Sequence, residues 1–206
     1  FMSDEDQDGI DPDDELYAVA PTRRRVMIAF DWGRGYVSPF QPTADDTSDA
    51  IMTRAGLGPG SVVVDLGSGD GILLVAAAQK GAHAIGYELS SELNEKAHRR
   101  AADQGVLDRI QIYDQDFTEV DVLGVIEEAA GSRLQDRNSR NLIVMYLLPE
   151  FLLKMLDKVQ RWLQLGGPTL RVATVRWPLE GLRAESENEV QGGTPYYIYS
   201  ALSINQ

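Results

Sequence analysis

A short buried strand that runs directly into a glycine-rich turn is the feature that most constrains how this chain can fold. Residues 62–71 read Val-Val-Val-Asp-Leu-Gly-Ser-Gly-Asp-Gly. The β-branched residues favour a strand, and the apolar, alanine-rich stretch 72–80 favours a helix that Gly81 closes. Glycines in the turn can adopt positive φ and let a ligand approach the backbone. The stretch therefore predicts a strand, turn and helix that bind a nucleotide-like ligand at the carboxyl end of a sheet.

The spacing of the glycines distinguishes this turn from the dinucleotide fingerprint G-x-G-x-x-G. Gly67, Gly69 and Gly71 alternate with other residues, and Ile72 stands where the third fingerprint glycine would be. A tight turn without a ligand is the structural alternative. Three glycines within five residues destabilise an ordinary connection, however, so the spacing favours a ligand-binding turn.

The rest of the chain alternates predicted strands and helices, which is typical of an α/β protein. This order predicts a Rossmann-like, mostly parallel sheet with helices on both faces and right-handed crossovers. We interpret 179–194 as a polar connection with a turn at 192–193, and 132–140 as an exposed loop. The predicted strands cover 62–66, 82–87, 110–113, 141–146, 170–177 and 196–204. The predicted helices begin near 44, 72, 91, 118 and 151, and the fourth extends to 131. Thr43 and Ser90 are the predicted N-caps of the first and third helices.

Length and composition limit the class of protein. The chain has 206 residues, no cysteine, two histidines and a net charge of −13, eight of the acidic residues lying in 1–21 without a base. We predict a flexible acidic tail over 1–21 and one domain over 22–206. Asp4 to Glu15 matches a calcium-loop pattern, but we interpret it as part of the tail, so no metal site is expected. The charge argues against nucleic acid as a partner, and no apolar run could span a membrane.

The sequence Asp65-x-Gly67-x-Gly69-x-Gly71 resembles motif I of the class I S-adenosylmethionine (SAM) methyltransferases. Within that class, residues 36–177 are similar to the FAM173-like protein-lysine methyltransferases. The resemblance rests on four stretches: Tyr36-Val37-Ser38-Pro39, the glycine turn, Gly86-Tyr87-Glu88-Leu89 and Tyr146-Leu147-Leu148-Pro149-Glu150. It implies SAM as the cofactor and an antiparallel C-terminal strand. The family has a seven-stranded sheet, of which the sequence indicates six strands.

The resemblance also implies a role for each matched position. Glu88 follows the second predicted strand. Its spacing from Gly71 along the chain is about that expected of an acid that accepts hydrogen bonds from ribose hydroxyls. Asp65 would orient the turn or bond the amino group of SAM, Asp116 and Phe117 would bracket adenine, and Met145 would face the sulfonium. The expected cofactor-binding residues are Asp65, Gly67, Ser68, Gly69, Asp70, Gly71, Glu88, Asp116, Phe117 and Met145.

Methyl transfer to a lysine requires an aligned and deprotonated amine, whose reference pKa is about 10.4. Desolvation by aromatic side chains lowers that pKa. Tyr146 and Trp177 are the expected catalytic aromatic residues, with Tyr36 and Phe40 as further aromatic candidates near the site. Glu150 is the expected proton acceptor, and Asp31 is the alternative.

These observations predict a SAM-dependent methyltransferase that acts on a basic, lysine-bearing protein. Alternatives are a small-molecule methyltransferase and a non-catalytic SAM-binding subunit, while the glycine spacing disfavours a nicotinamide oxidoreductase. No insertion suggests the lid domain that small-molecule enzymes often add. We expect an intracellular, cytoplasmic protein, and a mitochondrial location stays open if a targeting segment precedes this sequence.

Overall fold

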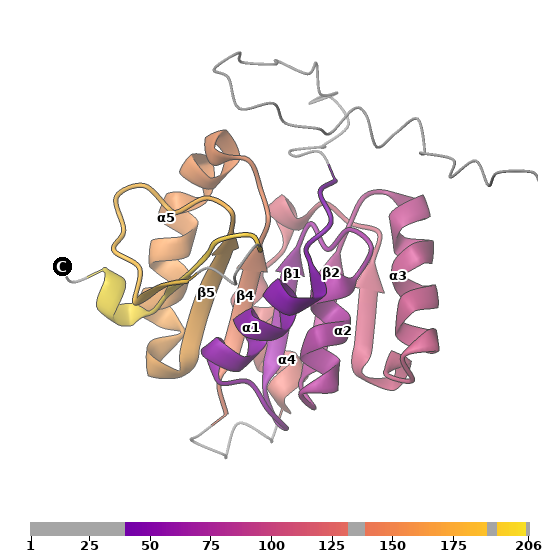
Figure 1. The fold of residues 1–206 in the computed structure, drawn as a ribbon. Coiled ribbons are helices and arrows are strands. Elements are labelled where there is room, and N and C mark those ends of the chain that lie inside the picture. Colours follow the sequence, from indigo (N-terminus) through magenta and orange to yellow (C-terminus); the bar gives the residue numbers. More distant parts are fainter. Residues whose placement is uncertain (1–39, 132–138, 189–192, 205–206) are drawn as a thin grey trace, which may run out of the picture.

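A single mixed sheet forms the centre of the molecule (Figure 1). The computed structural model describes residues 40–131, 139–188 and 193–204. Within these ranges the sheet has seven strands in the order β3-β2-β1-β4-β5-β7-β6. The first five in this order are parallel, β7 runs antiparallel to β5, and β6 runs antiparallel to β7. The strands are β1 (Val62–Leu66), β2 (His83–Tyr87), β3 (Ile110–Tyr113), β4 (Asn141–Met145), β5 (Leu170–Val175), β6 (Ser186–Asn188) and β7 (Tyr196–Tyr199).

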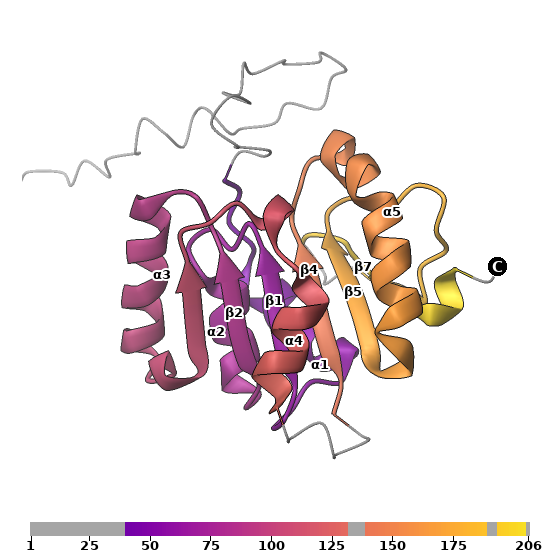
Figure 2. The ribbon, with the colours of Figure 1, turned by 180° about the vertical axis from the view of Figure 1, so that it is seen from behind.

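Helices cover both faces of the sheet, as expected for parallel strands that must be buried on both sides (Figures 1 and 2). Among the described helices, three pack on one face of the sheet and two on the other. Figure 2 shows the face with two helices. None of the helices in the described ranges is long and apolar enough to cross a membrane. The helices are α1 (Asp45–Ala55), α2 (Ile72–Gln79) and α3 (Ser91–Asp103) on the first face, and α4 (Val122–Ala130) and α5 (Pro149–Leu165) on the second.

The core consists of two apolar clusters, one on each face of the sheet. Alternate residues of a strand point to opposite faces. In β1, Val62, Val64 and Leu66 join the cluster under α4 and α5, whereas Val63 joins the cluster under α1 and α2. By the same alternation Asp65 lies on the α2 face, so a carboxylate occupies a position where the strand pattern supplies an apolar residue.

The predicted α/β class, the parallel strands and the antiparallel C-terminal strand are confirmed. The prediction of only six strands is wrong, because Ser186–Asn188 adds β6 at the sheet edge beside β7. An edge strand of three polar residues has neither apolar alternation nor β-branched residues to reveal it. The C-terminal strand also ends at Tyr199 rather than 204, since a 3₁₀ turn follows at Ala201–Ser203.

Two helix boundaries differ from the sequence prediction. Ala44, not Thr43, is the N-cap of α1, and its side chain makes no capping hydrogen bond. The helix predicted over 118–131 is divided into a 3₁₀ turn at Phe117–Glu119 and the shorter α4. The Asp121 side chain accepts a hydrogen bond from Gly124 N–H and caps α4. The helix therefore begins at Val122, later than the sequence predicts. The Ser90 cap of α3 is as predicted, with its hydroxyl accepting from Leu93 N–H.

Gly71 joins β1 to the helices on the first face, and its replacement tests this packing. Gly71 has φ +77°, and a Cβ atom there would lie 2.7 Å from Ala97 Cβ on α3. We expect Gly71→Ala to lower the free energy of unfolding by about 2–5 kcal/mol, from left-handed strain plus overpacking. Urea denaturation measures this loss.

Gly105 supplies the matched control. It has φ +66°, and no atom lies within 4 Å of the position that a Cβ atom would take, so Gly105→Ala carries only the strain of about 1–2 kcal/mol. Equal losses in the two variants would show that the contact between the turn and α3 contributes nothing.

Candidate functional site

The glycine turn is fixed to the neighbouring strand by its own backbone. Gly67 N–H and Ser68 N–H both donate to the Tyr87 carbonyl, at 2.9 and 3.1 Å. The three glycines Gly67, Gly69 and Gly71 have φ of +85°, +52° and +77°. Residues with a Cβ atom avoid such φ values, so the alternation of glycine seen in the sequence is a conformational requirement of this turn.

Glu88 connects this turn to the first turn of α3. Its Oε2 accepts from Gly69 N–H at 3.1 Å, and its Oε1 accepts from Ser90 N–H at 2.8 Å. Asn94 Nδ2 donates to the Glu88 carbonyl, so α3 fixes the acid from two directions. A carboxylate has about four lone-pair positions, so Glu88 can still accept from two ribose hydroxyls. The ribose role of Glu88 stays a prediction.

Asp65 is the most unusual group in the site. It is 1% exposed, and neither carboxylate oxygen has a hydrogen-bond partner among the described residues. Burial raises the pKa of Asp65 to about 8, and the charges of Glu88 and then Asp70 contribute to the rise. A buried carboxyl without a partner costs folding free energy unless a ligand supplies one. A cationic ligand beside Asp65 would satisfy it.

Asp70 and Ser68 lie in the glycine turn, and their side chains point towards α3 and β2, the two elements that support the turn. The Asp70 carboxylate forms an ion pair with Arg100 on α3, and Arg100 Nε donates to the Asp70 carbonyl at 3.1 Å. The Ser68 hydroxyl lies over Gly86, where an added Cβ would come within 2.6 Å of it, and it has no partner in the described part of the chain. Asp70 therefore secures the turn to α3, while Ser68 Oγ remains an unused polar atom.

The ends of β3 and β4 converge on the turn from the other side. A Cβ atom on Gly67 would lie 3.5 Å from Leu147 Cδ2 and 4.0 Å from Phe117 Cε1. Phe117 is buried and packs edge-on against Phe151, with centroids 5.8 Å apart. Asp116 Oδ1 accepts from Thr118 N–H at 2.8 Å, which leaves its second oxygen for a ligand. The predicted adenine pair thus lies beside the turn.

The Met145 side chain, which is expected to face the sulfonium, points into the core in this structure. It is fully buried in the cluster under α4 and α5. Strand alternation explains this, because Met145 points to the same face as Ile143, whereas Tyr146 packs against the opposite cluster. Of the two residues expected at the end of β4, Tyr146 alone is partly exposed.

An aromatic pair stands at the carboxyl ends of β4 and β5. The Tyr146 and Trp177 rings have centroids 6.0 Å apart and are tilted by 56°. The Arg176 guanidinium lies 5.1 Å from the Trp177 ring centroid, in cation–π geometry. Thr174 Oγ1 donates to the Trp177 carbonyl at 2.7 Å and fixes the segment after β5. Glu150 is exposed in the first turn of α5, and no described contact joins it to this pair.

Arg176 belongs to no sequence motif, whereas Phe40 is among the aromatic residues expected near the site. Arg176 has φ +72°, and its N–H donates to the Pro195 carbonyl at 2.6 Å. A non-glycine residue in the left-handed region stores strain, and such residues concentrate at functional sites. Phe40 packs its ring against Gly69, where a Cβ atom would lie 2.8 Å from Phe40 Cε2. Asp31, Tyr36 and the acidic segment 1–21 lie outside the described residues.

Comparisons with known proteins agree with this geometry. The family model for mycolic acid cyclopropane synthetase matches residues 41–127. The ribosomal protein L11 methyltransferase of Listeria monocytogenes serotype 4a (strain HCC23) is 29% identical over 152 residues, covering 73% of this chain and 43% of that protein. The lysine N-methyltransferase of the ATP synthase C-subunit from Homo sapiens is 29% identical over 168 residues, covering 79% and 60%.

Solved structures show the same fold. An RNA methyltransferase from Salinibacter ruber in complex with S-adenosyl-L-homocysteine aligns with a TM-score of 0.62 and 24% identity, covering 78% of this chain and 94% of that one. The ribosomal protein L11 methylase of Lactobacillus delbrueckii subsp. bulgaricus aligns with a TM-score of 0.52 and 20% identity, covering 78% and 80%.

The chain has the fold of the class I SAM-dependent methyltransferases, and the proteins to which it is similar include a lysine N-methyltransferase of the ATP synthase C-subunit. It spans 43% of the L11 methyltransferase and 60% of the human lysine methyltransferase that it matches. The residues present fit SAM, the cofactor of the class. The glycines give the turn its left-handed backbone, Gly67 is partly exposed, and the unpartnered Asp65 oxygens suit a ligand with ammonium and sulfonium charges.

The raised pKa of Asp65 predicts a pH-dependent cost in stability. The folded state keeps the Asp65 proton up to pH about 8, whereas the unfolded chain releases it near its ordinary pKa of 3.8. Because unfolding releases a proton between these values, stability falls as pH rises from about 4 to about 8. Asp65→Asn removes this dependence, so we expect the variant to exceed the wild type by roughly 1 kcal/mol or more at pH 8.

Thermal melts of both proteins at pH 5 and pH 8, without ligand, measure this difference. The gain in melting temperature should shrink towards pH 5. A constant difference at the two pH values would mean that Asp65 is ionised in the folded protein.

The strain at Arg176 predicts an unusual order of stability between two substitutions. Glycine accepts φ +72° without strain, whereas alanine retains the strain of about 1–2 kcal/mol, and both lose the contact with Trp177. We expect Arg176→Gly to be more stable than Arg176→Ala by about 1 kcal/mol in urea denaturation, the reverse of the usual preference. An alanine variant at least as stable as the glycine variant would show that the segment relaxes.

Proposed function

We propose that this protein transfers a methyl group from SAM to the side-chain amine of a lysine in a protein substrate. The observation that carries the proposal is the aromatic pair Tyr146 and Trp177 at the carboxyl ends of two adjacent parallel strands. Ligands of open α/β sheets bind at that end. The Trp177 ring already has a cation, the Arg176 guanidinium, over its face.

SAM supplies an electrophilic methyl group on a sulfonium, and the chain supplies alignment. Gly67 and Gly69 would border the methionine part, Glu88 would accept from the ribose hydroxyls, and Asp116 with Phe117 would border the adenine. Asp65 would accept from the ammonium group. Such alignment of donor and acceptor is the main protein contribution when the cofactor holds the reactive group.

The acceptor amine must lose its proton before the displacement, because its lone pair forms the new carbon–nitrogen bond. Tyr146 and Trp177 would surround the amine with aromatic surface, which disfavours its charged form and lowers its pKa. Glu150, exposed at the start of α5, would accept the released proton. The sulfonium carbon–sulfur bond breaks as the new bond forms, and S-adenosylhomocysteine leaves as the neutral thioether.

The named activities of the relatives support a protein acceptor. The Listeria monocytogenes relative is a ribosomal protein methyltransferase, and the human relative is a lysine N-methyltransferase of an ATP synthase subunit. These two substrates differ, and the chain covers only part of each relative. We therefore propose a polypeptide acceptor, the class that the two relatives share. We propose lysine as the methylated residue because of the aromatic pair and the named activity of the human relative.

Calorimetric titration with S-adenosylhomocysteine, with NAD as control ligand, tests cofactor binding. We expect the former alone to bind, and Glu88→Ala to weaken it by about tenfold or more, since hydrogen bonds to a charged group contribute about 1.5–3 kcal/mol. Binding of NAD, or no binding of S-adenosylhomocysteine, would overturn the assignment of the cofactor site.

Transfer from radiolabelled SAM to a protein extract, followed by acid hydrolysis and detection of methyllysine, tests the acceptor. We expect Trp177→Ala and Tyr146→Phe to reduce methyllysine formation while leaving S-adenosylhomocysteine affinity within about twofold, because neither ring belongs to the cofactor set. Label confined to small molecules would favour a small-molecule methyltransferase. Cofactor binding without transfer to any fraction would favour a non-catalytic subunit.

A further inference from the structure

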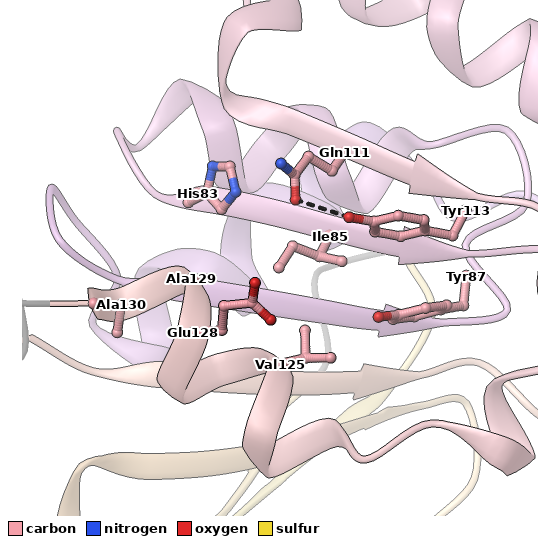
Figure 3. A pocket seen from close by; sticks show the side chains of 10 residues that line it. His83, Ile85, Tyr87, Gln111, Tyr113, Val125, Glu128, Ala129 and Ala130 are labelled. Carbon is pink, nitrogen blue, oxygen red and sulfur yellow. Dashed lines mark hydrogen bonds between the residues drawn. The ribbon is translucent and has the colours of Figure 1, made fainter.

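A second concave surface lies on the other side of the sheet from α2 and is not used by the chemistry above. It is a groove of about 530 Å³ over β2 and β3, with α4 as its opposite wall (Figure 3). Helix α4 packs against β1 and leaves the outer strands of this face uncovered (Figure 2). The lining residues are His83, Ile85, Tyr87, Gln111, Tyr113, Val125, Glu128, Ala129, Ala130 and Gly131.

Aromatic rings form the floor at one end of this β2–β3 groove. Tyr87 and Tyr113 are the last residues of their strands and stack with centroids 5.4 Å apart at 19°. Tyr87 is 4% exposed, whereas Tyr113 is 43% exposed, which is unusual for a large ring on a sheet face. Tyr113 donates from its hydroxyl to Gln111 Oε1 at 3.3 Å, which fixes the ring beside the groove (Figure 3).

The electrostatics of the groove favour a cation. Glu128 is the only lining side chain, among the described residues, with a full charge at neutral pH, and no described cation pairs with it. Figure 3 shows its carboxylate pointing from α4 towards β2, into the same space as the Tyr87 hydroxyl. The last turn of α4 forms the same wall, and the carbonyls at a helix C-terminus carry partial negative charge.

Three independent sources of negative potential therefore meet on one surface: a carboxylate, a helix C-terminus and the faces of aromatic rings. Burial raises the pKa of Tyr87, and Tyr113 and Glu128 raise it further, so the phenol stays neutral beside the carboxylate. Beyond the far end of the groove, a smaller pocket contains Arg109 paired with Asp108.

We propose that the β2–β3 groove binds a basic polypeptide segment, with a lysine or arginine side chain lying between Glu128 and Tyr113. The groove lies on the α4 face, whereas Tyr146 packs with the cluster under α1 and α2. It would serve as a docking surface for the protein substrate, and that role alone depends on the proposed function. Binding of the peptide itself does not depend on it.

Fluorescence anisotropy with a fluorescein-labelled peptide of alternating lysine and glycine tests the proposal on the full chain, with saturating S-adenosylhomocysteine. Glu128→Gln should lower the affinity for the peptide about fivefold, which is the effect expected for loss of one partly exposed ion pair. Glu127→Gln is the matched control, because Glu127 is an exposed neighbour on α4 that does not line the groove. It should change the affinity less than twofold.

Tyr113→Ala provides a second variant, and it should weaken the peptide without changing S-adenosylhomocysteine affinity. Equal effects of Glu127→Gln and Glu128→Gln would show diffuse attraction to an acidic surface and overturn the proposal, as would absence of peptide binding. Loss of binding in Trp177→Ala but not in Glu128→Gln would place the peptide at the aromatic pair instead.

Light scattering after size-exclusion chromatography tests whether a second copy of the chain occupies the groove. A dimer that Tyr113→Ala dissociates would mean that a second copy of the chain fills the groove, which overturns the proposal. The proposed methyl transfer has its own readouts. If methyllysine formation fails while the peptide still binds through Glu128, the proposed function is wrong and the groove assignment stands. If transfer is intact but the peptide does not bind, the groove assignment alone is wrong.

Discussion

The hydrogen bonds from the glycine turn to the end of β2 are the interaction on which the rest of the site depends. Gly67 and Ser68 both donate to one carbonyl, that of Tyr87, and the next residue, Glu88, accepts from Gly69. The turn is thus fixed at two consecutive residues of the neighbouring strand. Since β1 and β2 pair in parallel with Leu66 opposite Tyr87, any change in sheet register would misplace both the turn and the acid. The pairing of β1 with β2 therefore also sets the positions of the glycine turn and of Glu88.

Asp65 shows what this arrangement costs the folded protein. An apolar residue at its position would complete the cluster under α2, as Val63 does two residues earlier. Instead the chain buries a carboxyl with no partner among the described residues, next to Glu88 and Asp70. Arg100 neutralises Asp70 but not Asp65. The unpaired carboxyl suits the proposed cofactor, whose ammonium group would give Asp65 the partner that the described residues do not supply.

Much of the fold could be predicted from sequence because apolar strands and helices alternate strongly. The glycine turn, the position of Glu88 after β2 and the Ser90 cap all follow from local rules of backbone conformation. The Met145 side chain is buried because strand alternation turns it to the same face as Ile143, and its expected role at the sulfonium stays a prediction. β6 carries no pattern, since a short polar edge strand depends on its pairing with β7. Arg176 acquires its left-handed backbone from tertiary contacts, which no local signal encodes.

Two residues of the groove support the site through their backbone carbonyls alone, while their side chains lie in the groove. Tyr87 directs its carbonyl to the glycine turn and its side chain into the groove. Tyr113 makes a similar double contact one strand further out, because its carbonyl accepts from Glu88 N–H. A ligand that moved either ring would have to do so by side-chain rotation, since both backbones are fixed by the parallel ladder. The two rings are stacked on one another and Tyr87 is buried, so such rotation is restricted. Ligands of the proposed site and of the proposed groove would therefore share one rigid pair of strands, β2 and β3, as their support.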